Sequence, residues 1–164
     1  MKLRFLLLGA LAFLLLVGVT FARRAALELP NFGYWSAKSL RAAEPQLRKE
    51  VAGPNKTSSI KLADYGSSNV ALSHREADGI PEVHAHMDDY FVVQSGAATL
   101  VIGGSVVNPK QTDPGETRGE TINGGERRAL TTGDIVHIPA NLPHQLLVAK
   151  GQAFTYFVVK VKVP

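Results

Sequence analysis

The chain has 164 residues, of which 45% are hydrophobic, with no cysteine and a formal net charge of +4 at pH 7. This length is sufficient for one domain with its own core and is short for two. The lack of cysteine excludes disulfide bonds, thiolate nucleophiles and cysteine-ligated zinc. Without residues 1–22, which carry two basic residues and no acidic one, 16 basic residues stand against 14 acidic ones. That balance does not indicate a nucleic-acid partner.

The N-terminal residues have the order of an export signal. A basic start at residues 1–4 precedes an uncharged run over 5–22, and two arginines follow it. Thr20 and Ala22 are small residues at the two positions that signal peptidase requires. We therefore expect residues 1–22 to be a signal peptide and the protein to be periplasmic or secreted. The alternative is a membrane anchor, because the apolar run is just long enough to span a bilayer.

Residues 23–56 are expected to form a linker and a short helix. Ser36 is a favourable N-cap for a helix over residues 37 to about 43. Pro45 argues against one long helix, because proline removes a helical hydrogen bond.

From residue 57 onwards the chain contains short strand-like segments separated by glycine, proline, asparagine and aspartate. The predicted strands are 57–63, 69–76, 82–86, 89–94, 97–102, 127–130, 135–138, 145–149 and 154–163. This pattern is typical of an all-β sandwich or barrel, which we place in residues 57–164. Residues 108–125 contain many glycines and prolines and are expected to be a long insertion, either functional or mobile.

The segment 82–89 offers candidate metal ligands. Alternate side chains of a strand lie on one face, so Glu82, His84 and His86 project together. If the two residues after His86 form a hairpin loop, Asp89 lies opposite His86 on that same face. A slightly longer loop would turn Asp89 outward and bring Asp88 in.

A later turn adds His144, so that three imidazoles and a carboxylate can converge on one metal ion. Phe91, Val93 and Leu147 are expected to form an apolar pocket wall that limits the substrate to a small molecule. His137 lies on an apolar strand and is expected to be a satisfied or solvent-facing histidine. His74 is not expected to bind metal, because it has no partner at ligand spacing.

These two segments resemble the two motifs of the cupin superfamily, and the resemblance covers about residues 60–161. The first motif is a glycine, His-x-His, an acidic residue and a glycine, matched here by Gly79, His84, His86, Asp89 and Gly96. The second is a glycine, Pro-x-Gly and a histidine, matched here by Gly133, Pro139 and His144, with Asn141 in place of the second glycine. The resemblance is to small single-domain bacterial cupins, and it implies a jelly-roll barrel, the double-stranded β-helix.

The resemblance also implies one divalent transition metal held by His84, His86, Asp89 and His144. Asp89 replaces the usual glutamate after a shortened spacer, so Asp88 and Glu82 remain alternative carboxylate ligands. Mixed nitrogen and oxygen ligation suits Fe, Mn, Ni, Zn or Cu and does not select among them.

We therefore expect an exported metal-binding cupin that binds or acts on a small molecule, as a dioxygenase, isomerase or lyase. The alternative is a non-catalytic binding or storage module with a structural metal or none. A homodimer is also expected, with residues 57–64 as the candidate edge strand. Membrane contact is expected only through an uncleaved N-terminal segment.

The last strand is expected to place one apolar stripe in the core and its lysines in water. The core stripe is Phe157, Val159 and Val161, and the exposed residues are Lys160 and Lys162.

Overall fold

The computed structural model describes residues 30–164. The expected signal peptide or anchor over residues 1–22 lies outside the described residues. Within residues 30–164, no helix is both long enough and apolar enough to cross a membrane.

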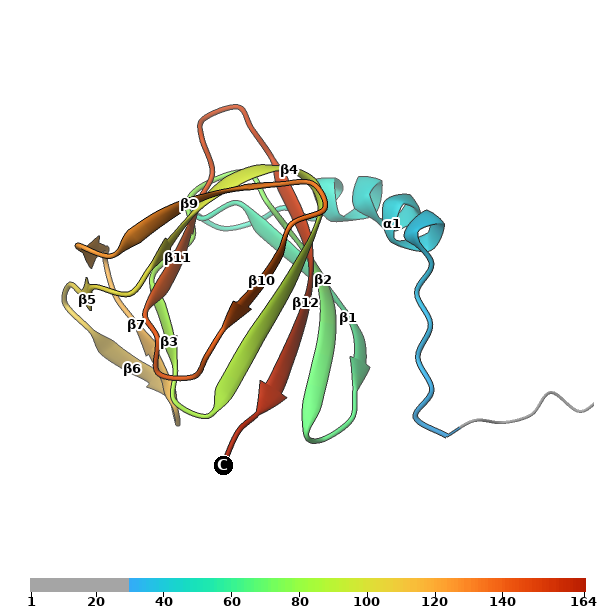
Figure 1. Cartoon of the computed structure of the whole chain (residues 1–164). Coiled ribbons are helices and arrows are strands. Elements are labelled where there is room, and N and C mark those ends of the chain that lie inside the picture. Colours follow the sequence, from blue (N-terminus) through green and yellow to red (C-terminus); the bar gives the residue numbers. More distant parts are fainter. Residues whose placement is uncertain (1–29) are drawn as a thin grey trace, which may run out of the picture. The chain divides into compact units, whose positions relative to one another are not determined.

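One helix and twelve short or long strands follow one another along the described chain (Figure 1). They are α1 (Ala37–Lys49), β1 (Thr57–Asp64), β2 (Ser68–Arg75), β3 (Glu82–His84), β4 (Met87–Ile102), β5 (Ser105–Val106), β6 (Lys110–Asp113), β7 (Glu116–Arg118), β8 (Ile122–Asn123), β9 (Glu126–Thr131), β10 (Ile135–Ile138), β11 (His144–Leu147) and β12 (Phe154–Lys162).

The strands form a curled antiparallel sheet in which β4 is the central element. The sheet order is β1-β2-β12-β4-β11-β3-β7-β6, and β9 and β10 also pair with β4. The first half of β4 lies between β12 and β10, and its second half lies between β11 and β9. This arrangement confirms the expected all-β barrel, with β1 at one edge of the sheet (Figure 1).

Gly96 lets β4 continue where two separate strands were expected. Its φ is +80°, a left-handed conformation that favours glycine. A Cβ at this position would lie 1.9 Å from the carbonyl oxygen of Ala153. The register between β4 and β12 also shifts nearby, at Thr155 and Tyr156. The second glycine of the first motif therefore allows the long strand to bend against β12.

The face of β12 that lines the interior of the barrel is the opposite of the expected one. Phe154, Tyr156 and Val158 are buried in the core, whereas Phe157 is half-buried on the outer face and packs against Trp35. The expected stripe of Phe157, Val159 and Val161 was therefore wrong by one residue. Both phases of this strand are apolar, so alternation alone did not fix which face lies inward.

Helix α1 is longer than expected, because it continues through Pro45 to Lys49. Ser36 is its N-cap, as expected. Leu47 is fully buried, and its carbonyl accepts a hydrogen bond of 2.7 Å from the Ser58 hydroxyl. This packing against β1 and β2 stabilises the last turns and offsets the hydrogen bond that proline removes.

The insertion at 108–125 contains β6, β7 and β8, and β7 pairs with β3. The insertion is therefore an ordered extension of the sheet beside the first motif. The pairing of β7 with β3 brings polar side chains of the insertion next to that motif.

We predict that Gly96→Ala destabilises the protein by at least about 2 kcal/mol more than Gly66→Ala, because the added methyl group meets backbone atoms. Gly66 is the matched control: its φ is +78°, but nothing lies within 4 Å of the position that a Cβ would take. The free energies of unfolding in urea would be compared. Equal losses in the two variants would contradict the role assigned to Gly96.

Candidate metal centre

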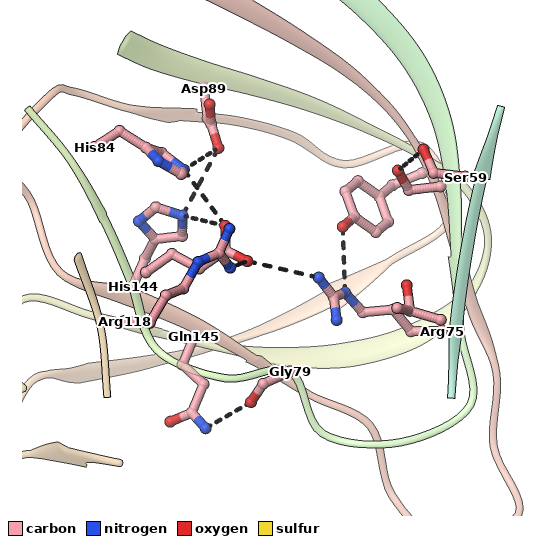
Figure 2. A network of polar contacts seen from close by, with 12 residues as sticks. Ser59, Arg75, Gly79, His84, Asp89, Arg118, His144 and Gln145 are labelled. Atoms are coloured by element: carbon pink, nitrogen blue, oxygen red, sulfur yellow. Dashed lines mark hydrogen bonds and ion pairs between the residues drawn. The ribbon is translucent and has the colours of Figure 1, made fainter. Parts of the chain in front are cut away.

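Four side chains from three strands converge at one place inside the barrel (Figure 2). Glu82 and His84 lie on β3, Asp89 on β4 and His144 on β11, where His144 pairs in register with Glu82. Each residue offers one ligand atom, and these atoms all lie within 4.8 Å of one another.

The ligand atoms of these residues face one another across short distances. His84 Nε2 lies 3.3 Å from Asp89 Oδ2 and 3.4 Å from Glu82 Oε2. His144 Nε2 lies 3.7 Å and 3.8 Å from the same two oxygens. His84, Asp89 and His144 are buried, and Glu82 is partly buried. The arrangement is thus two imidazoles and two carboxylates in a site that is largely shielded from water.

His144 presents a free nitrogen lone pair to the cluster. Its Nδ1 donates to the carbonyl of Leu142 at 3.1 Å, which fixes the tautomer. Its Nε2 is buried and has no hydrogen-bond partner among residues 30–164. Burial lowers the pKa of His144 and keeps the ring neutral at pH 7. A neutral imidazole with an unpartnered nitrogen facing two carboxylates is suited to bind a metal ion.

His84 is oriented by a carboxylate that the sequence motifs did not indicate. Its Nδ1 lies 2.6 Å from Glu116 Oε1, which comes from β7 of the insertion. This contact directs Nε2 towards the cluster. Burial opposes protonation of the ring, but the contacts with Asp89 and Glu82 outweigh it and raise the pKa of His84 to about 9.

Both carboxylates of the cluster are held in their charged form. Burial disfavours the charged form of Glu82. The contact with His84 and the positive charge of Arg118 outweigh this effect and keep the pKa of Glu82 well below its usual range. Arg118 also donates a hydrogen bond to Glu82. Burial likewise opposes ionisation of Asp89, and His84 and Lys160 outweigh it, so the pKa of Asp89 is lowered.

Lys160 points into the barrel, so the expectation that it faces water was wrong. Its Nζ lies 2.7 Å from both oxygens of Asp89 and 2.8 Å from His84 Nε2. On β12 it is in phase with the buried Tyr156 and Val158, whereas Lys162 is exposed as expected. Correct assignment of the face of β12 that points inward would have predicted the position of Lys160.

The structure brings together three of the four ligands inferred from the motifs, His84, Asp89 and His144. His86 is exposed and lies outside the cluster. The expected hairpin is absent from the described residues, because β3 ends at His84 and pairs with β7 and β11 instead of β4. Glu82, kept as an alternative carboxylate, takes the fourth place.

The remaining alternative and the other two histidines have structural partners. Asp88 accepts a hydrogen bond of 2.8 Å from the backbone N–H of Ala140 and lies 3.1 Å from the exposed His137. His74 is fully buried, with its Nδ1 2.7 Å from the hydroxyl of Thr155. Neither His74 nor His137 belongs to the cluster, as expected.

The structure places the three residues expected to form the pocket wall in different surroundings. Phe91 lines a small cavity beside the cluster, of about 10 Å³, together with Arg75 and Tyr156. Val93 is buried in the core, and Leu147 lies in a separate groove over β9 and β11. The cavity has room for about one water molecule, so it bounds the cluster closely on that side.

The residues present fit a divalent transition metal. Such an ion binds imidazole nitrogen and carboxylate oxygen at about 2.0–2.2 Å, so its ligand atoms lie about 3–4 Å apart. Small side-chain adjustments would bring the four ligand atoms, now within 4.8 Å, to that spacing. The unpartnered His144 nitrogen supports the same assignment.

Neither a protein-family model nor a curated protein sequence matches the chain. Solved structures do match it. TT1209 of Thermus thermophilus aligns with a TM-score of 0.50 and 18% identity, over 71% of this chain and 94% of that one. A cupin protein of Bacteroides fragilis gives a TM-score of 0.49 and 15% identity, over 82% and 87% of the two chains.

A sugar phosphate isomerase of the cupin superfamily from Silicibacter pomeroyi gives a TM-score of 0.45 and 24% identity, over 66% of this chain and 60% of that one. At these identities the likeness concerns the fold alone. The curled antiparallel sheet and the position of the two motif segments on its strands agree with it. The strand order and the two motif segments on its strands are those of a single curled β-barrel, the cupin-type fold inferred from the motifs.

Proposed function

We propose that this protein binds one divalent transition metal ion through Glu82, His84, Asp89 and His144, and that the metal in turn binds a small molecule. The observation that carries this proposal is the buried Nε2 of His144, which has no hydrogen-bond partner in the described part of the chain and faces two ionised carboxylates. A buried polar atom without a partner is costly, and a metal ion would satisfy it.

Four protein ligands leave room for one or two further ligands, and a bound metal supplies Lewis-acid or redox chemistry there. The surrounding residues hold the cluster in shape: Glu116 orients His84, and Arg118 holds Glu82. Phe91 limits the space on one side. Isomerisation, lyase chemistry and oxygenation of a small molecule are the reactions that the cupin resemblance implies.

The test is the metal content of the protein after loading with Fe(II), Mn(II), Ni(II) or Zn(II) and desalting. We expect about one equivalent in the wild type and a loss in both His84→Ala and His144→Ala, because each removes one imidazole ligand. His86→Ala is the matched control and should keep its metal, because His86 is exposed and outside the cluster. A folded wild type without metal would contradict the proposal.

A non-catalytic small-molecule binding or storage module is the second candidate function. The observation that favours it is the ammonium group of Lys160, which satisfies the buried charge of Asp89 without any metal. Under this alternative the loaded protein retains no metal, and His144→Ala leaves its metal content unchanged.

Metal binding should weaken in acid. A metal ligand must be a neutral imidazole, whereas His84 holds a proton up to a pKa of about 9. Between pH 6.5 and 8.5 the dissociation constant for Zn(II) should therefore fall about tenfold per pH unit, because one proton is displaced. Competition with a chromophoric chelator would measure it. His86→Gln should show the same slope, and a pH-independent constant in the wild type would contradict this expectation.

We further propose that the protein is exported. The order of a basic start, an apolar run and small residues before position 23 supports this proposal. Expressed in a bacterial host, the mature protein should begin at Arg23 and be found in the periplasm or medium. An intact N-terminus in the membrane fraction would favour the anchor over residues 5–22, and an intact N-terminus in the cytosol would contradict export.

A further inference from the structure

We propose that Lys160 and the metal ion compete for one position, so that metal binding requires the lysine side chain to leave the cluster. This inference rests on the proposed function. The contacts that carry it are those of Nζ, which lies 2.7 Å from both oxygens of Asp89 and 2.8 Å from His84 Nε2. These are ligand atoms assigned to the metal.

An ammonium group and a metal ion cannot occupy this space together. A metal bonded to Asp89 and His84 at about 2.0–2.2 Å would lie on the same side of those atoms as Nζ. The two cations would then be nearly in contact inside a site that is shielded from water. Repulsion between charges at such separations is strong where the dielectric constant is low.

Charge balance leads to the same conclusion. Three carboxylates surround the site, Glu82, Asp89 and Glu116. Besides the imidazolium of His84, three cationic side chains contact these carboxylates, namely Arg75, Arg118 and Lys160. The network is therefore compensated before a divalent ion is added. An incoming ion of charge +2 is therefore more favourable when one of these three side chains withdraws.

Lys160 is the cation that is free to withdraw. Arg118 contacts Glu82 and Glu116, and Arg75 donates a hydrogen bond of 3.2 Å to the Tyr156 hydroxyl. Within residues 30–164, the polar contacts of Lys160 Nζ are all with atoms that would bind metal, and the side chain is 26% exposed. It also lies near the end of β12, and its flexible stem allows the ammonium to reach water.

The exchange gives Lys160 a specific role as a built-in competitor. Asp89 keeps a positive partner at every stage, so the buried carboxylate is never left alone. Only an ion that binds the cluster more strongly than the ammonium does can enter. Lys160 therefore sets the minimum affinity that a metal ion needs in order to displace the ammonium group from the cluster.

The direct test is the reactivity of the lysine amines in the full-length chain, with and without Zn(II). Limited acetylation followed by mass spectrometry would give the modification rate of each lysine, and metal content would be measured in the same samples. We expect the rate of Lys160 to rise at least threefold on metal binding. Lys162, exposed and two residues away, is the internal control and should not change.

The second test is the Zn(II) affinity of Lys160→Met and Lys162→Met, measured by chelator competition. We expect Lys160→Met to bind at least tenfold more tightly, because the competing cation is gone and Asp89 has lost one of its two positive partners. Lys162→Met should match the wild type.

The outcomes separate the two proposals. One equivalent of metal together with unchanged Lys160 reactivity, or with equal affinity in Lys160→Met, would overturn the exchange and leave the metal site standing. Absence of metal from both the wild type and Lys160→Met would overturn both. If Lys160→Met does not fold, the acetylation experiment on the wild type still decides.

Discussion

The buried carboxylate of Asp89 is the constraint on which the rest of the site depends. It is 1% exposed, and an ionised carboxylate at such a place requires positive or hydrogen-bonding partners. His84 and Lys160 supply them from β3 and β12. Glu116, which lies in the insertion, in turn orients His84. The candidate metal centre is thus a connected network of charged and hydrogen-bonded side chains.

The strand β4 explains how residues far apart in sequence reach this network. It pairs with β12 and β10 before its bend at Gly96 and with β11 and β9 after it. Asp89 is therefore in register with Lys160, while β11 carries His144 alongside the other half. The same strand therefore organises the sheet and positions the residues of the site.

The strand pattern predicted most of the fold, because turn residues and β-branched runs are local signals. Two imidazoles and Asp89 could also be found, since the motif spacing places them. The sequence could not show that β3 ends at His84, because its pairing with β7 and β11 is non-local. For the same reason the sequence did not indicate the contact of Glu116 with His84, because residues 108–125 were expected to form a loop. Lys160 was missed because β12 is apolar on both phases, so periodicity did not settle which face lies inward.

We propose a metal ion held by two imidazoles and two carboxylates. X-ray absorption spectroscopy at the metal edge of the loaded protein tests it most directly. We predict light-atom ligands at about 2.0–2.2 Å, with the multiple-scattering signal of two imidazoles. A signal of three imidazoles would show that His86 enters the shell and that the cluster is incomplete. No imidazole signal would contradict the site altogether.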